Sequence, residues 1–417
     1  MNRVKDFLFQ QLKYGFFFRK RLKDIQRFCD LSEHDLLELE SQILKSHIAN
    51  AYKKSSFYKE LYDRHGVVLS QIQNREDLKQ LPMITKDDIK SKVNNLYIGN
   101  KIKHISYTSG TSGSPLKVYY DINCILNEAS YNEIFRNNGG HYFGQKVVSL
   151  RGVLDRKTMK YFDKFTNTLF LSSFNLNKKN IKFYYKEFQK FQPNAILAYP
   201  SSLELLSNLL IDAGLELNVP VIFTSSETLY DYQREKIERV LNTKIYDRYG
   251  NAERTISLIQ QNSNAIYHEA KLYSINEYQE HSVITTNLMN KNFPLIRYEV
   301  NDSIELLRKE IPPVINRIVG RIDDYLITKD GTKIGRMDLV FKGVHNIKFA
   351  QIIQNDSDYF IVNIVKAKQY IKRDEDAIRK NIIDRIGGET LFEFKYIGEH
   401  DLIKTKRGKF KLVINNI

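Results

Sequence analysis

The sequence Tyr107-Thr108-Ser109-Gly110-Thr111-Ser112-Gly113-Ser114-Pro115-Leu116-Lys117-Val118 combines hydroxyl side chains with two glycines and then reaches a lysine. Gly110 and Gly113 lack a Cβ atom, so the backbone beside them is able to approach a polyanion closely. Backbone N–H groups in such a turn form an anion-binding nest, and hydroxyl donors surround it at Thr108, Ser109, Thr111, Ser112 and Ser114. We therefore predict a phosphate-binding loop with Lys117 as a cation at its exit.

The residues on either side of this loop are β-prone. Ile102 to Ser106 precede it and Val118 to Tyr120 follow it, so we expect the loop to join two strands. A Walker-type loop is excluded, because it needs Gly-Lys-Ser/Thr leading into a helix and here Val118 follows Lys117. A flexible Ser/Gly linker is the alternative, but such linkers do not normally lie between β-prone runs within a domain.

Length and composition indicate a folded protein of several domains. The chain has 417 residues, and its 42% hydrophobic and 12% aromatic content excludes a disordered polymer. The two cysteines, Cys29 and Cys124, are too few for a disulfide framework or a cysteine-rich zinc site, which suits a reducing cytoplasm. No apolar run approaches the ~20 residues that span a bilayer, and the N-terminus lacks a secretory pattern. We expect a cytoplasmic protein.

The formal net charge of +15 permits two interpretations. One is an anionic partner such as a nucleotide, a nucleic acid or an acidic membrane. The other is a general abundance of lysine, which we favour because no basic block is long enough for a nucleic-acid-binding tail. Residues 1–24 are a local exception, since basic and aromatic side chains interleave there. Such a helix either lies on the inner face of an anionic membrane or packs on the protein body.

Hydrophobic periodicity divides the chain into zones. Spacings of three and four predict helices over residues 31–65, and Thr85 is a good N-cap for a helix that begins at Lys86. Between about 100 and 250, short β-rich runs alternate with helical stretches, which predicts an α/β domain with a largely parallel sheet. Residues 265–320 are strand-rich. After Gly320 a compact α+β segment follows, with a helix over 373–385.

Five further segments carry chemistry-bearing residues. Ser225-Ser226-Glu227 ends a β-run, which puts accessible backbone at the carboxyl edge of a sheet, where α/β folds bind ligands. Three more are Tyr246-Asp247-Arg248-Tyr249-Gly250-Asn251-Ala252-Glu253, then Pro294-Leu295-Ile296-Arg297-Tyr298-Glu299-Val300-Asn301-Asp302, and Gly320-Arg321-Ile322-Asp323-Asp324. Near the end of the chain stands Thr405-Lys406-Arg407-Gly408-Lys409. Each alone has a bland interpretation as a solvated turn, helix start or lysine-rich tail.

Together these segments resemble the signatures of the adenylate-forming superfamily (acyl-CoA synthetases, luciferases, adenylation domains) in the order that the family has them. Finer features resemble its phenylacetate–CoA ligase/CapK-type branch, which often serves capsule and exopolysaccharide pathways; they are Leu81 to Lys86, Ala198 to Leu203 and Phe349 to Gln354. The resemblance implies a large, multi-layered α/β N-terminal AMP-binding domain over 1–319, with a mostly helical lead-in over 1–95. A small, mobile α+β C-terminal domain over 320–417 would act as a lid.

The resemblance also implies roles for single residues. The nucleotide would be bound by the loop residues Thr108, Ser109, Gly110, Thr111, Ser112, Gly113 and Lys117, by the adenine strip Ser225, Ser226 and Glu227, by Tyr249 beside the adenine, by Asp302 at the ribose and by Arg321 at a phosphate. Glu253 and Lys409 would be catalytic, with Glu253 as the Mg²⁺ ligand. Asp323 would be the hinge. Ala252, Glu299 and Asn301 depart from the family's threonine, arginine and glycine.

The chemistry so implied is activation of a small carboxylic acid by ATP. Attack of an anionic carboxylate on the α-phosphate is opposed by like charge, so the protein's contribution is positioning and charge stabilisation. The acyl-AMP would pass its acyl group to a thiol, on CoA or a carrier protein, or to an amine of a sugar or amino acid. His141 is a candidate for the acyl pocket, although a lone histidine is more often structural. A non-catalytic nucleotide-binding scaffold is the alternative; a nucleic-acid-binding protein rests on charge alone.

Overall fold

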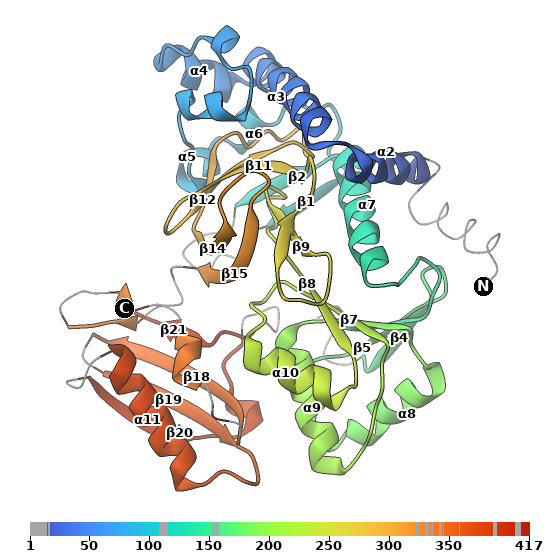
Figure 1. The fold of residues 1–417 in the computed structure, drawn as a ribbon, viewed down its shortest axis with the longest axis vertical. Coiled ribbons are helices and arrows are strands. Elements are labelled where there is room, and N and C mark those ends of the chain that lie inside the picture. Colours follow the sequence, from blue (N-terminus) through green and yellow to red (C-terminus); the bar gives the residue numbers. More distant parts are fainter. Residues whose placement is uncertain are drawn as a thin grey trace. The chain divides into compact units, whose positions relative to one another are not determined.

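The computed structural model describes residues 15, 17–107, 116–151, 154, 158–321, 326–329, 333–334, 337–341, 344, 346–357, 359–386, 390–404 and 410–417. At 320, 321, 333, 338 and 339 it describes the backbone alone. The fold is mixed α/β, with a large N-terminal part built on sheets and a small C-terminal domain (Figure 1). Two compact units are distinguished, Met1–Gln145 with Tyr246–Ile318, and Lys146–Ile245 with Val319–Ile417. The domain division expected between residues 319 and 320 remains a prediction.

Helices form the N-terminal part of the first unit, as predicted. Ser32 caps one of them by accepting a hydrogen bond from the Asp35 N–H at 3.1 Å, and Thr85 and Asp88 form a reciprocal capping box. The α-helices are α2 (Phe18–Asp30), α3 (Glu33–Lys54), α4 (Ser56–Arg64), α5 (Lys86–Lys90), α6 (Val93–Leu96) and α7 (Ile122–Asn138), with 3₁₀ turns at Leu69–Gln71 and Arg75–Gln80.

Helix α2 packs on the protein body. It lies beside α7 (Figure 1), and Arg21 donates a hydrogen bond to Asn123 at 3.2 Å. Ile25 is buried in a cluster with Tyr131 and Tyr273. The basic segment predicted over 1–24 is thus a packed helix from Phe18 onward, while residues 1–14 and 16 lie outside the described residues. Within the described chain, every helix is too short or too polar to cross a bilayer.

The strands of the first unit form three sets. β1 (His104–Tyr107) and β2 (Lys117–Tyr120) pair antiparallel, which confirms two strands on either side of the predicted phosphate loop. A second set has the order β11-β12-β13, and a third has the order β14-β15-β10-β9-β8. Their bounds are β8 (Lys244–Gly250), β9 (Ser257–Gln260), β10 (Tyr267–Glu269), β11 (Ser274–Tyr278), β12 (Val283–Asn287), β13 (Tyr298–Val300), β14 (Asp302–Arg308) and β15 (Val314–Arg321). The strand-rich zone predicted over 265–320 is confirmed.

The second unit begins with the predicted parallel sheet. Its strands stand in the order β7-β6-β3-β5-β4, and all adjacent pairs are parallel except β5 with β4. The elements are β3 (Val147–Leu150), β4 (Lys160–Asp163), β5 (Thr168–Leu171), α8 (Ile181–Phe191), β6 (Ala195–Ala198), α9 (Pro200–Ala213), β7 (Val221–Ser225) and α10 (Asp231–Val240). Continuous apolar runs such as Val221–Phe223 are buried, as strands covered on both faces require.

The C-terminal domain completes this unit as the predicted α+β segment. Its main sheet has the order β20-β19-β18-β21, and a small hairpin pairs β16 with β17. Phe349, Val365 and Leu402 join the same buried cluster as the leucines of α9. The elements are β16 (Leu326–Ile327), β17 (Lys333–Ile334), a 3₁₀ turn (Met337–Phe341), β18 (Ile347–Asp356), β19 (Tyr359–Lys366), α11 (Lys372–Ile386), β20 (Leu391–Tyr396), a 3₁₀ turn (Glu399–Asp401) and β21 (Val413–Asn415).

Candidate active site

The turn after β8 carries the predicted metal ligand, Glu253. Gly250 ends the strand where a Cβ atom would lie 3.1 Å from the Ile256 carbonyl oxygen, so a larger residue would crowd the turn. Asn251 holds the turn closed, because its Oδ1 accepts the Thr255 N–H at 3.0 Å and its Nδ2 donates to Thr255 Oγ1 at 2.7 Å. Glu253 is buried here, and the Tyr298 hydroxyl donates to its Oε1 at 3.2 Å.

Tyr298 is held by a segment that lies far away in the sequence. Ile84 forms a parallel bridge with Tyr298, in which the Ile84 N–H donates to the Arg297 carbonyl at 2.9 Å and the Glu299 N–H donates to the Ile84 carbonyl at 2.9 Å. This contact gives the run Leu81 to Lys86 a physical role, because it aligns the strand from which Tyr298 reaches Glu253.

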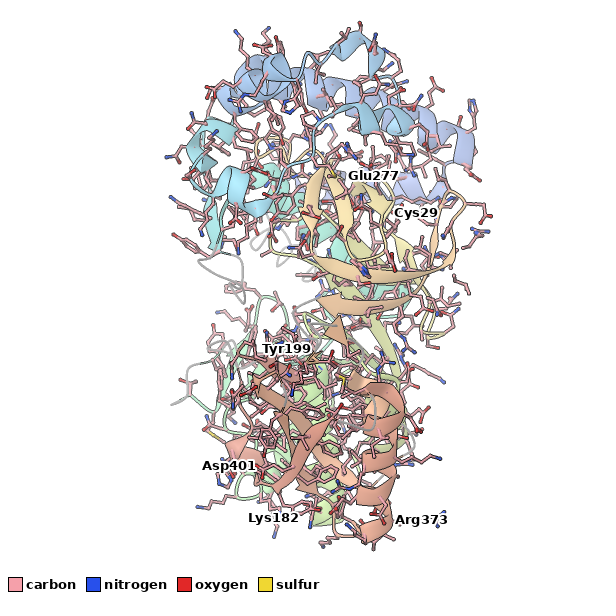
Figure 2. The ribbon with its side chains drawn as sticks, turned by 90° about the vertical axis from the view of Figure 1, so that its left-hand side faces the viewer. Cys29, Lys182, Tyr199, Glu277, Arg373 and Asp401 are labelled. Carbon is pink, nitrogen blue, oxygen red and sulfur yellow. The ribbon has the colours of Figure 1, made fainter. Side chains whose placement is uncertain are left out.

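Arg297 secures the same segment through its side chain. Its guanidinium donates to both carboxylate oxygens of Glu277 at 2.9 Å each, and to the carbonyls of Lys79 at 3.2 Å and Leu81 at 2.5 Å. Figure 2 labels Glu277 at the edge of the first unit's strands. Arg297 also has a φ of 51°, in the left-handed region that costs a non-glycine residue about 1–2 kcal/mol. The sequence assigned no separate role to this arginine. In the structure its side chain joins Glu277 to the backbone of Lys79 and Leu81.

Two predicted nucleotide residues, one from β8 and one from β14, are in direct contact. Tyr249, one residue before the end of β8, donates its hydroxyl to Oδ2 of Asp302, the first residue of β14. The sequence assigns Tyr249 to the adenine and Asp302 to the ribose, so their direct contact agrees with one nucleoside bound by both. The roles themselves remain predictions.

The exit of the phosphate loop is joined to the Glu253 turn. Tyr120, at the end of β2, donates its hydroxyl to the Ala252 carbonyl. The Arg254 guanidinium lies 3.8 Å from the centre of the Tyr120 ring and donates to the Cys124 carbonyl at 2.9 Å. Because cation–π contact and hydrogen bond act together, β2, the start of α7 and the turn form one rigid corner.

A buried ion pair supports this corner. Arg248 donates to Glu128 Oε1 at 2.9 Å and the Tyr273 hydroxyl donates to Glu128 Oε2 at 2.7 Å. Burial alone would raise the pKa of the Glu128 carboxyl, but Arg248 and Arg254 outweigh it and lower that pKa to about 2. Glu128 therefore stays ionised and balances two arginines that flank the Glu253 turn.

Other predicted residues of the first unit are placed less fully. Lys117 begins β2, and its ammonium nitrogen lies 4.9 Å from the centre of the Tyr119 ring. The loop residues Thr108, Ser109, Gly110, Thr111, Ser112 and Gly113 lie outside the described residues. His141 is buried, and burial together with Arg136 lowers its pKa to about 4, so its imidazole is neutral at physiological pH.

The second unit carries the predicted adenine strip. Ser225 ends β7 and accepts a hydrogen bond from Arg151 at 3.4 Å, while Ser226 has a φ of 73° that turns the chain sharply. Glu227 accepts from the Ser201 N–H at 3.1 Å and the Ser201 hydroxyl at 3.2 Å, at the first turn of α9. A carboxylate at a helix N-terminus is favoured by the helix dipole.

Glu227 also contacts the C-terminal domain. Its Oε1 accepts the N–H of Phe410 at 3.1 Å, and Phe410 directly follows the predicted catalytic lysine in the chain. Lys409 and the predicted hinge residue Asp323 lie outside the described residues, and Arg321 is described by its backbone alone, at the end of β15. Sequence reasoning placed Glu227 on the adenine strip and did not foresee its bond to Phe410.

The residues present fit a magnesium ion that is shared with a substrate. Among the described residues, no three His, Cys, Asp or Glu side chains gather as a metal cage. Mg²⁺ bound with nucleotides usually takes one or two carboxylates plus phosphate oxygens and waters. Glu253 supplies one carboxylate with a defined orientation, which suits such a site.

Comparison with known proteins gives consistent matches. A family model described as the CapK C-terminal domain matches residues 326–416. Protein CapK of Staphylococcus aureus is 28% identical, over 100% of this chain and 96% of that protein. Phenylacetate–coenzyme A ligase of Escherichia coli (strain K12) is 26% identical over 72% of this chain and 74% of its own length. Indoleacetate–lysine synthetase of Pseudomonas savastanoi is 25% identical over 49% of this chain and 54% of its own length.

A solved structure shares the fold. It is a 2-hydroxyisobutyryl-CoA ligase in a postadenylation state, in complex with R3-HIB-AMP, and it superposes with a TM-score of 0.71 at 15% sequence identity. The superposition covers 93% of this chain and 90% of that one.

Proposed function

Because this chain belongs to the adenylate-forming ligase superfamily, in its CapK and phenylacetate–CoA ligase-like branch, we propose that it activates a carboxylic acid with ATP and transfers the acyl group to a thiol or an amine. The first step forms acyl-AMP and pyrophosphate. The observation that supports this most is the meeting of two distant motifs in the first unit: Tyr249 contacts Asp302, and Glu253, four residues after Tyr249, contacts Tyr298.

The residues have separate tasks in this reaction. Asp302 accepts hydrogen bonds from the ribose hydroxyls, for which the two oxygens of a carboxylate are suited. The hydroxyl-rich loop and Lys117 bind the phosphates, and Glu253 holds Mg²⁺, which when bound screens the phosphate charge. Lys409 bridges the attacking carboxylate and the α-phosphate, and rotation about Asp323 later withdraws it. Arg321 contacts a phosphate.

The acceptor is either a thiol or an amine. One relative is named a coenzyme A ligase and another a lysine synthetase, so the branch includes both chemistries. We propose that the acyl group goes to CoA, a carrier protein, or an amine of a sugar or amino acid. The resemblance to the CapK-type group favours a role in capsule or exopolysaccharide biosynthesis. Peripheral contact of residues 1–24 with the inner membrane face stays part of the proposal.

Pyrophosphate release from ATP tests the first step. The protein is offered a panel of aliphatic, aromatic, amino and sugar acids, and Lys409→Ala is assayed beside the parent. We expect acid-dependent release that falls about 10²–10³-fold in the variant, the usual cost of removing one preorganised donor. Lys406→Ala is the matched control: it removes a lysine three residues away and should leave release unchanged.

The same experiment distinguishes the ligase from a non-catalytic nucleotide-binding scaffold. A non-catalytic nucleotide-binding scaffold would bind ATP but release no pyrophosphate with any acid. Release that Lys409→Ala leaves intact would show that the C-terminal signature is misassigned. Where an acid is active, CoA, glucosamine and lysine are then supplied in turn, and the one that accelerates AMP release identifies the acceptor class.

A further inference from the structure

A buried glutamine holds both stems of the segment that carries Lys409. Gln351 lies on β18 with a relative exposure of 0%. Its Nε2 donates to the carbonyls of Ile403 and Lys411 at 2.9 Å each, and its Oε1 accepts the Ile403 N–H at 3.1 Å. The chain that enters residues 404–410 and the chain that leaves them are thus bound by one side chain.

Two further contacts fix the same segment. Lys404 and Phe410 form an isolated antiparallel bridge, so the segment leaves and returns at neighbouring backbone positions. Beyond the small domain, the Phe410 N–H donates to Glu227, whose carboxylate is itself fixed by Ser201. On either side of residues 405–409, Ile403 and Lys411 are therefore bound by Gln351 of the C-terminal domain, and Phe410 is bound by Glu227 of the parallel-sheet part of the second unit.

We propose that Gln351 is a positioning residue for adenylation, which acts by placing Lys409 through the backbone of Ile403 and Lys411, with Glu227 as the receiving contact. This inference rests on the proposed function of Lys409. Lys409 is covalently joined to Phe410, so the direction of the Phe410 backbone limits where the lysine side chain reaches. Gln351 lies within the C-terminal domain, whereas Glu227 follows β7 of the parallel sheet.

A second buried glutamine on the same strand, Gln354, makes the same kind of hydrogen bond to a different segment. Gln354 lies on the same strand with a relative exposure of 1%, and it also pairs with backbone. It accepts the Ile327 N–H at 2.7 Å and donates to the Ile327 carbonyl at 2.7 Å, on the hairpin strand β16. Gln351 and Gln354 thus have the same burial and the same kind of bond, but only Gln351 contacts the stems of residues 404–410. This makes Gln354 a matched control.

Hydrogen exchange of the full-length protein tests the clamp without any substrate. Methionine has nearly the shape of glutamine but neither donates nor accepts as an amide does. Gln351→Met should speed exchange at the Ile403 and Phe410 amides, because one loses its acceptor and the other its support. Gln354→Met should speed exchange at Ile327 and leave those two amides as in the parent. Equal protection of Ile403 and Phe410 in all three proteins would overturn the clamp.

Kinetics test its role in adenylation. With the most active acid of the panel, ATP–pyrophosphate exchange should fall about 10²-fold in Gln351→Met, since a displacement near 1 Å has that effect on a positioned group. The KM for ATP should stay within about threefold, because the hydrogen bonds of the Gln351 side chain to described residues go to Ile403 and Lys411, neither of which is a predicted nucleotide residue. The loss should therefore appear in kcat. Gln354→Met should retain most of the exchange rate.

The outcomes separate the two hypotheses. Unchanged exchange in Gln351→Met, or an equal loss in Gln354→Met, would overturn the positioning role while the ligase activity stands. If the parent itself is inactive with every acid, the proposed function fails, and the positioning role falls with it, whatever the amide exchange shows about the clamp.

Discussion

Removing the Arg297 guanidinium should destabilise the first unit severely. In Arg297→Met the side chain keeps its apolar stem but loses two bonds to Glu277 and those to the carbonyls of Lys79 and Leu81. The Glu277 side chain, 18% exposed, would then be a largely buried carboxylate without its cation. Breaking a buried pair in this way costs about 3–5 kcal/mol. For a unit of this size the unfolding midpoint should fall by about 6–20 °C.

The assay is urea and thermal unfolding of four proteins: the parent, Arg297→Met, Glu277→Leu and the double variant. Once Glu277 is gone, the second substitution should cost less than it does alone, with a coupling energy of about 0.5–3 kcal/mol. Arg297→Lys should fall between, because one ammonium cannot reproduce the planar fork. A loss below about 1 kcal/mol in Arg297→Met, or strict additivity in the cycle, would refute the bonding described here.

Two further predictions concern the Glu253 turn. Tyr298→Phe keeps the ring but removes the donor to Glu253, a bond to a charged group worth about 1.5–3 kcal/mol, so the unfolding midpoint should fall by about 3–12 °C. Pyrophosphate release should also need more Mg²⁺ and slow about tenfold or more, and an identical Mg²⁺ titration would contradict this. Glu128→Gln should remove a pH dependence of the free energy of unfolding. The pKa of Glu128 is lowered from 4.5 to about 2, which corresponds to a stabilisation of about 3 kcal/mol. This stabilisation is complete above pH 4.5 and is lost as the pH falls toward 2. The difference in unfolding free energy between parent and variant, measured over that range, should shrink on acidification, and a constant difference would contradict the assignment.

Features that depend on near neighbours in the sequence could be predicted. The Thr85 cap needs only Asp88 three residues on, and the strands beside the phosphate loop follow from two β-prone runs. The parallel sheet over 146–245 follows from alternating strand and helix patterns. The order of the motifs indicated the family, because each motif is a short run of contiguous residues and can be recognised without knowing any tertiary contact.

The contacts that orient the site could not be read from the sequence. Ile84 forms a backbone bridge with Tyr298, and the Gln351 side chain donates hydrogen bonds to the carbonyls of Ile403 and Lys411; no local sequence pattern specifies either contact. The Glu227 carboxylate illustrates the reason. Its place at the end of β7 was predictable, but its bonds depend on where α9 begins and where the C-terminal domain docks. Tertiary register, rather than propensity, decides such contacts.

The departures from the family motifs bear on whether the chain has kept its activity. At Ala252 the structure uses the backbone carbonyl, which accepts the Tyr120 hydroxyl, and at Glu299 it uses the backbone N–H, which donates to Ile84. Neither contact depends on the side chain that has changed, so the frame around Glu253 tolerates both substitutions. A decayed site would be expected to lose the groups whose side chains make the frame. Arg297, Tyr298 and Asn251 all make side-chain hydrogen bonds in this frame, as the site of an active ligase requires.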